Sequence, residues 1–221
     1  MTHLILIRHA QTVANAEGRW VGWGDTPLTP EGQAEVQATA RRLAAEASDA
    51  VALYTSPLPR TWETAAAIGQ ALGLSPVPLD DLREINFGEM EGVTLEELKE
   101  HHTETYLQWR DRENVNFTWP GGERRADFFQ RVSAAFDHIL ARHPQGTVIV
   151  VGHGGTLRAA LAYLLSGEMS RWWGYSIEHC ALTRLLVEGG EARLLALNDT
   201  GHLAPQAPLT TGKDFEPEQS P

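Results

Sequence analysis

Cysteine is almost absent from this chain of 221 residues, which contains Cys180 alone. A single cysteine excludes an internal disulfide bond and a metal centre built from several cysteines. Long apolar runs are also absent: segments such as 147–151 have the length of a strand, well short of the roughly 18 apolar residues of a membrane-spanning helix. Residues 1–8 lack the basic start and the full apolar core of a signal peptide. We therefore predict a cytoplasmic protein without a membrane partner.

Positive charge is scarce as well. The chain has 18 basic and 29 acidic residues, which gives a formal net charge of −11. Such a charge repels polyanions, so nucleic acid is a poor candidate partner. Only Lys99 and Lys213 are lysines, and the other basic residues are arginines, whose forked guanidinium groups bind phosphate in a bidentate way. An acidic surface can still enclose a small positive pocket.

Three motifs of common enzyme classes are missing. No Gly-x-Gly-x-x-Gly or P-loop pattern follows a predicted strand, so the sequence gives no sign of a nucleotide cofactor. The Gly-x-Ser-x-Gly pattern of serine hydrolases is also missing. His101 and His102 have no companions at metal-ligand spacing and are interpreted as an exposed helix end.

Short apolar runs alternate with amphipathic segments along the chain. Predicted strands cover 4–7, 50–54, 77–79 and 147–152, predicted helices 30–47, 59–72, 94 onward, 123–143 and 156–165, and a closing hairpin 181–187 and 192–197 around a four-residue turn. This order predicts one three-layer αβα domain over residues 1–202 with a mostly parallel central sheet. Residues 203–221 show no periodicity and are predicted to be a disordered tail.

Groups suited to phosphate chemistry stand where predicted strands end. Arg8 and His9 follow the first strand, Arg60 follows the second, and His153 precedes a Gly-Gly helix start. A neutral imidazole can attack phosphorus while guanidinium groups neutralise the oxygens, and Glu84, in an irregular loop, could protonate the leaving oxygen. Taken singly, each residue has a structural interpretation, such as a strand-end histidine or a solvated loop carboxylate. Their joint placement favours a shared site at the carboxyl edge of the sheet.

Several separated motifs resemble those of the histidine phosphatase superfamily, the phosphoglycerate mutase-like proteins. They are Arg8-His9-Ala10-Gln11-Thr12-Val13-Ala14-Asn15, the stretches 22–25 and 28–32, Ser56-Pro57-Leu58-Pro59-Arg60-Thr61, the stretch 82–92, and Val151-Gly152-His153-Gly154-Gly155. Ala10 stands where the family usually has glycine. The order and spacing of the motifs over roughly residues 3–200 are far more specific than any one of them.

The resemblance implies a role for each matching residue. His9 would be the nucleophile that forms a phosphohistidine, and Glu84 the general acid and base. Arg8, Arg60 and His153 would bind the phosphate, with additional contacts from Asn15 and the backbone amide of Gly154, which opens a helix. No metal or other cofactor is implied.

The loop after the nucleophile supplies candidates for substrate recognition. Glu17 and Arg19 are its polar members, and Trp20, Val21, Gly22 and Trp23 form the segment that is typically Phe-Thr-Gly-Trp in the mutases of the family. Trp20 and Trp23 could line a pocket for an apolar or aromatic leaving group, or they could anchor the loop to the core. Both interpretations stay open.

Val21 and the short segment between residues 91 and 121 favour the phosphatase branch of the family, with water as the acceptor. We therefore expect a phosphomonoesterase that acts on a small phosphorylated metabolite. A cofactor-dependent phosphoglycerate mutase is the first alternative, and a phosphate-binding protein without catalysis is the second. The adjacent Trp172 and Trp173 could belong to the core, a lid or an interface, so a homodimer is also possible.

Overall fold

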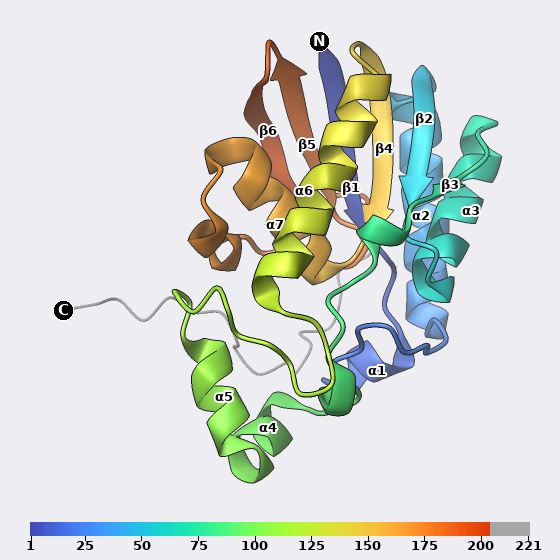
Figure 1. Cartoon of the computed structure of the whole chain (residues 1–221). Coiled ribbons are helices and arrows are strands. Elements are labelled where there is room, and N and C mark those ends of the chain that lie inside the picture. Colours follow the sequence, from blue (N-terminus) through green and yellow to red (C-terminus); the bar gives the residue numbers. More distant parts are fainter. Residues whose placement is uncertain (204–221) are drawn as a thin grey trace.

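A computed structural model describes residues 1–203 and contains a six-stranded sheet in the order β3-β2-β4-β1-β5-β6 (Figure 1). The strands are β1 (Thr2–Arg8), β2 (Ala50–Thr55), β3 (Val77–Pro78), β4 (Gly146–Gly152), β5 (Leu182–Glu188) and β6 (Glu191–Asp199). The first four run parallel, whereas β5 pairs antiparallel with both β1 and β6. The sheet is mixed and mostly parallel, as the sequence predicts.

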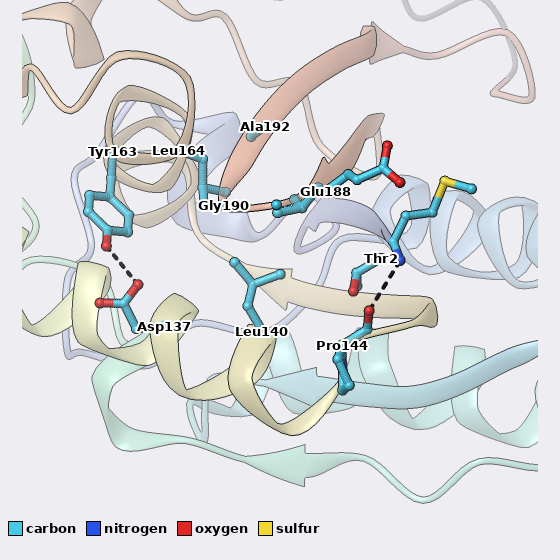
Figure 2. Close-up of a pocket in the computed structure, with 12 residues that line it drawn as sticks. Thr2, Asp137, Leu140, Pro144, Tyr163, Leu164, Glu188, Gly190 and Ala192 are labelled. Carbon is cyan, nitrogen blue, oxygen red and sulfur yellow. Dashed lines mark hydrogen bonds between the residues drawn. The ribbon is translucent and has the colours of Figure 1, made fainter.

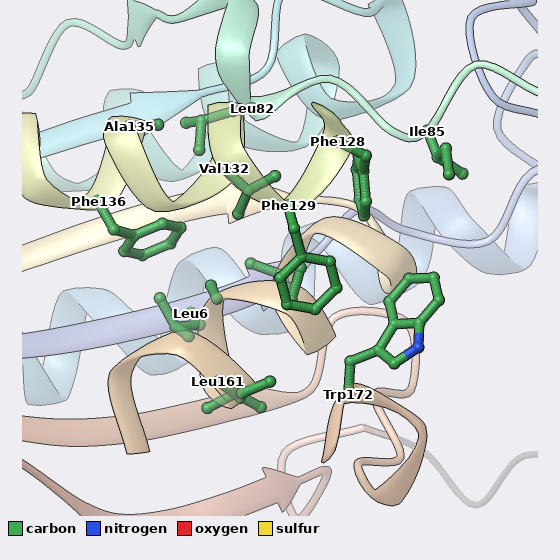
Figure 3. Close-up of a cluster of buried hydrophobic side chains, with 14 of the residues drawn as sticks. Leu6, Leu82, Ile85, Phe128, Phe129, Val132, Ala135, Phe136, Leu161 and Trp172 are labelled. Atoms are coloured by element: carbon green, nitrogen blue, oxygen red, sulfur yellow. The ribbon is translucent and has the colours of Figure 1, made fainter. Parts of the chain in front are cut away.

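Helices cover both faces of the sheet. Helices α2 (Pro30–Glu46) and α3 (Pro59–Leu72) lie on one face, and α6 (Arg125–Arg142) and α7 (Gly154–Ser166) on the other (Figure 1). Alternate side chains of β1 serve the two layers: Leu4 and Leu6 pack in the cluster with α6 and α7 (Figure 3), while Ile5 and Ile7 pack in the cluster with α2 and α3. This two-sided burial of the central strands confirms the three-layer αβα architecture.

Three short helices lie beyond the carboxyl end of the sheet (Figure 1): α1 (Val13–Ala16), α4 (Leu95–His101) and α5 (Thr103–Arg110). The sequence pattern indicates α4 through its capping box at Thr94, which the structure contains. It does not reveal α1, which is a single turn, or α5, none of whose residues is buried. Without a buried face, α5 has no apolar periodicity to detect.

The predicted boundaries agree with the structure to within two residues, and two of the differences have a clear structural cause. Helix α6 begins at Arg125 rather than Glu123, because the Glu123 amide donates to the Asn86 carbonyl and ties the preceding turn to the loop after β3. The β5–β6 connection is a two-residue turn, since Glu188 pairs with Glu191. Its glycines, Gly189 and Gly190, have φ of 60° and 87°, the positive values that a tight two-residue hairpin turn requires.

The predicted tail begins at residue 203, and its residues 204–221 lie outside the described part of the chain. Leu203 itself packs against a small cluster that includes Ala10, Leu28 and Val36. Within residues 1–203, no helix has the length and apolar character needed to cross a membrane.

Candidate active site

The carboxyl ends of β1, β4 and β2 meet at one edge of the sheet and bring together residues that are distant in sequence. Strand β1 ends at Arg8, and the amide of His9 donates to the Gly152 carbonyl at the end of β4 over 2.9 Å. His153 follows, with its ring centroid 5.2 Å from that of His9. Ser56, just beyond β2, places its hydroxyl 2.9 Å from His153 Nε2. The parallel arrangement therefore gathers two imidazoles in one buried corner.

His9 is held in one tautomer. Its Nδ1 lies 2.8 Å from the Ala10 carbonyl oxygen, and because a carbonyl only accepts, Nδ1 carries the proton and Nε2 keeps its lone pair. Burial, followed by the charge of Arg60, holds the pKa of His9 well below its ordinary value. The ring is therefore neutral at neutral pH, with a basic nitrogen available.

His153 is completely buried and is neutral for the same reasons, since burial and then Arg60 hold its pKa well below the ordinary value. With Nε2 beside Ser56, its Nδ1 has no hydrogen-bond partner among the described residues. The Ser56 hydroxyl also accepts from the Leu58 amide. His153 itself does not line the cavity, so its unsatisfied nitrogen lies beside the His9 ring, next to the cavity rather than in its surface.

The two arginines have different neighbours. Arg8 lines the cavity beside His9 and donates from Nη1 to the Ile177 carbonyl over 2.9 Å. Arg60 is not among the cavity-lining residues, and its guanidinium donates to the carbonyls of Val21, Gly22 and Gly24 in the loop after α1. Burial lowers the pKa of Arg60 to about 10, so it stays charged at neutral pH. Arg60 thus fixes the loop after α1, and its positive charge lowers the pKa of His9 and His153.

Glu84 places a buried carboxylate in the same cavity, with only 8% of its surface exposed. One oxygen accepts from the Gly155 amide at the start of α7 over 2.8 Å, and the other from the Ile85 amide over 3.0 Å. A Cβ at residue 155 would lie 2.4 Å from Glu84 Oε1, so a side chain there would displace this carboxylate. The amino end of α7 therefore orients this carboxylate.

Asn15 and Gly154 also line the cavity. Asn15 Oδ1 accepts from the amide and the hydroxyl of Thr12, which fixes the Asn15 side chain within the single turn of α1. A Cβ on Gly154 would lie 3.5 Å from Arg8 Nε, so the first residue of α7 packs directly against the guanidinium of Arg8. Arg8 and the α7 amino end together form a positive surface for an anion.

The cavity has a volume of about 560 Å³ and continues from these polar groups to an aromatic wall. The wall is formed by Trp20, Phe87, Trp109, Trp119, Trp172 and Trp173, whose rings contact one another in a continuous series. Arg125 also lines the cavity; it lies over the rings of Trp172 and Trp173 and donates to three backbone carbonyls. The cavity thus joins a phosphate-sized polar end to an apolar end.

The substrate-recognition candidates divide between cavity and scaffold. Arg19, Trp20 and Val21 line the cavity, although Arg19 is paired with Glu17 and Glu97. Trp23 instead donates from Nε1 to the Glu84 carbonyl, and the Arg83 guanidinium stacks on its ring. Gly22 has no room for a side chain, since a Cβ would meet the Ile85 carbonyl at 2.2 Å. Glu17, Gly22 and Trp23 are therefore structural neighbours of the cavity and do not line it.

Sequence reasoning missed four charged or titratable side chains of the cavity, Arg125, Arg158, Glu178 and His179. Arg158 had a detectable signal, because it lies four residues after Gly154 and so on the same face of α7. His179 precedes β5 and has no such signal; only the tertiary fold brings it within 5.8 Å of His9, measured between ring centroids.

A second cavity, of about 510 Å³, lies at the opposite end of the sheet (Figure 2). It is lined by the start of β1, the β5–β6 turn and side chains such as Asp137 and Tyr163, which share a hydrogen bond of 2.6 Å. It contains no histidine or arginine. Across residues 1–203, no group of three or more histidine, cysteine or acidic side chains is arranged to hold a metal ion. Of the two cavities, the one at the carboxyl edge of the sheet contains the histidine and arginine side chains suited to bind a phosphate group.

Comparison with known proteins agrees with this geometry. Residues 4–200 match the model of the histidine phosphatase superfamily (branch 1). The chain is 32% identical over 203 residues to phosphoserine phosphatase 1 of Hydrogenobacter thermophilus, covering 92% of this chain and 95% of that protein. It is also 32% identical over 214 residues to the probable phosphoglycerate mutase GpmB of Yersinia enterocolitica, with coverage of 92% and 95%.

Among solved structures, Bacillus stearothermophilus YhfR superposes with a TM-score of 0.82 at 30% identity, covering 92% of this chain and all of that one. The chain belongs to the histidine phosphatase superfamily, branch 1.

Proposed function

We propose that this protein is a phosphomonoesterase that hydrolyses small phosphorylated metabolites through a phosphohistidine on His9, without a metal ion. One observation carries the proposal. His9 is a buried, neutral imidazole whose Nδ1 proton is bound by the Ala10 carbonyl, so that Nε2 is a nucleophile in a cavity that also holds a carboxylate.

In the first step, His9 Nε2 attacks phosphorus and the ester P–O bond breaks. Arg8 and the amino end of α7 stabilise the phosphoryl oxygens, because both present N–H groups at this corner of the cavity. The Ser56 hydroxyl donates a hydrogen bond to His153 Nε2, so the proton of this imidazole is on Nδ1. Nδ1 thereby becomes a further donor beside His9. Protonated Glu84 passes its proton to the departing oxygen, and the alcohol leaves.

In the second step, the Glu84 carboxylate takes a proton from water as the water oxygen attacks the phosphoryl group. The N–P bond breaks, His9 regains its neutral form, and inorganic phosphate is released. Glu84 ends protonated and is ready for the next ester. Arg60 acts at one remove, since it fixes residues 21–24 of the adjoining loop and adds positive charge near His9.

The surroundings of the cavity favour water over a phosphoglycerate as acceptor. A mutase must grip a carboxylate with basic side chains, but Arg110 and Arg112 lie over the rings of Tyr106 and Trp173 and do not line the cavity. Arg19, Arg125 and Arg158 do line it, but Arg19 is already paired with Glu17 and Glu97, and Arg125 donates to three backbone carbonyls. The similarity to a phosphoserine phosphatase supports the same assignment.

The test is phosphate release from a panel of phosphomonoesters in the presence of EDTA, with His9→Ala as the comparison. We expect release by the wild type, its loss in the variant, and one phosphoryl group on the wild-type protein after quenching in alkali. Isomerisation of phosphoglycerate on addition of the bisphosphate, without phosphate release, would instead establish a mutase. Binding of phosphate esters with neither reaction would indicate a binding protein.

A further inference from the structure

The cavity contains a third imidazole, His179, that the proposed chemistry does not use. Only 5% of its surface is exposed, and it lines the cavity with its ring tilted 51° to that of His9 at a centroid distance of 5.8 Å. It belongs to the segment before β5, in which Ser176, Ile177 and Glu178 also line the cavity. This segment therefore borders the cavity next to Arg8.

The backbone on both sides of His179 is tied to Arg8. Arg8 Nη1 donates to the Ile177 carbonyl over 2.9 Å, and the Cys180 amide donates to the Arg8 carbonyl over 3.0 Å. Cys180 has a φ of 54°, a left-handed conformation that a residue with a side chain adopts at a cost. The fold thus fixes the position of His179 relative to the Arg8-His9 corner.

Neither ring nitrogen of His179 has a hydrogen-bond partner within residues 1–203. Burying polar nitrogens without partners is unfavourable, and such groups in native proteins point to a ligand or to function. Burial and then Arg8 hold the pKa of His179 well below its ordinary value. The ring is therefore neutral at neutral pH and offers one donor and one acceptor.

Its position separates His179 from His153. The His9 ring contacts both other rings, whereas no ring contact joins His153 and His179 within residues 1–203, and the backbone beside His179 is tied to Arg8. His179 therefore flanks His9 on the Arg8 side. From there, its ring can reach the first few atoms of a group esterified to a phosphate on His9, because the two rings are 5.8 Å apart.

We propose that His179 is a specificity-determining residue that hydrogen-bonds a hydroxyl group on the carbon next to the phosphate ester. A neutral imidazole donates from one ring nitrogen and accepts at the other, and a hydroxyl group can pair with whichever of the two faces the substrate. The substrate class is then the phosphomonoesters of polyols and hydroxylated metabolites, in preference to simple alkyl esters. This inference rests on the proposed phosphomonoesterase activity.

The test compares glycerol 1-phosphate with propyl phosphate, which have the same carbon chain but differ in hydroxyl groups. The readout is the ratio of the two kcat/KM values. We expect the wild type to favour glycerol 1-phosphate about tenfold, the value of one hydrogen bond that lacks its partner in the other ester. His179→Leu should bring the ratio of the two kcat/KM values close to the ratio of the uncatalysed hydrolysis rates of the two esters. His179→Gln keeps a donor and an acceptor and should restore part of the preference for glycerol 1-phosphate.

The ratio separates recognition from damage to the fold, because a structural defect lowers both kcat/KM values together. His138→Leu makes the same substitution at an exposed histidine of α6 and should keep the wild-type ratio. Equal losses for both esters in His179→Leu, or an unchanged ratio, would overturn the inference and leave the phosphatase assignment intact. If the wild type hydrolyses neither these esters nor any other, the proposed function itself fails.

Discussion

At the scale of single residues, the site depends on a close contact between Glu84 and Gly155. The Gly155 amide donates to one oxygen of the Glu84 carboxylate. The other oxygen occupies the space that a side chain at residue 155 would fill. The loop around Glu84 cannot easily retreat, because Trp23 and Arg131 both donate to the Glu84 carbonyl over 2.9 Å. A methyl group at residue 155 would therefore displace the carboxylate and leave the loop in place.

We expect Gly155→Ala to lower kcat/KM for an alkyl phosphate by about a hundredfold, the lower end of what a positioned general acid contributes. The loss should be smaller for 4-nitrophenyl phosphate, because nitrophenolate leaves without needing a proton. Gly174→Ala is the matched control, since a Cβ at Gly174 meets nothing within 4 Å. Equal losses for the two esters would argue against Glu84 as the proton donor.

At the scale of elements, α6 holds the acid loop through one arginine. Arg131 donates to the carbonyls of Asp81, Arg83 and Glu84 and forms a salt bridge of 2.7 Å with Glu123. The forked guanidinium makes these contacts together, which a lysine ammonium could not reproduce. A helix on one face of the sheet thereby sets the position of the candidate general acid.

We expect Arg131→Met to lower the free energy of unfolding by about 2–3 kcal/mol, because it leaves partly buried carbonyls and Glu123 without their donor. The kcat/KM for alkyl phosphates should fall as well. Arg171→Met, which removes an exposed ion pair with Glu168, is the control and should change little. Urea unfolding and steady-state kinetics measure the two effects; an Arg131 variant as stable as the control would show that α6 does not hold the loop.

The elements that sequence patterns predicted are those with a strong periodic or capping signal. Strands β1 and β4 are continuous apolar runs, and Gly73 ends α3 in the left-handed conformation expected of a helix-terminating glycine. Arg8-His9, Arg60 and His153 indicated a shared site because each follows a predicted strand and parallel strands end at one edge. These signals are local, or follow from one rule of topology.

At the scale of the whole molecule, the aromatic wall and His179 could not be predicted, because segments remote in sequence meet only in the folded protein. Trp20, Trp109 and Trp173 come from the first loop, α5 and the turn after α7, yet their rings lie 5.0 and 5.4 Å apart in succession. No periodicity links such residues. The acidic net charge was equally uninformative about the site, since buried arginines and a helix terminus set the local field.

The three buried histidines of the cavity also determine how the stability of the whole molecule depends on pH. Burial holds the pKa of His9, His153 and His179 well below the ordinary value, so the unfolded chain takes up protons below about pH 6.5 that the folded protein does not bind. Stability is therefore complete above that pH and is lost as the pH falls, by up to about 1.4 kcal/mol per pH unit for each histidine. Urea unfolding between about pH 7.5 and about pH 5.5, above the range in which ordinary carboxylates titrate, should show this decline. His179→Leu should reduce the slope of the free energy of unfolding against pH by the contribution of one histidine. A slope equal to that of the wild type would mean that His179 is protonated in the folded protein.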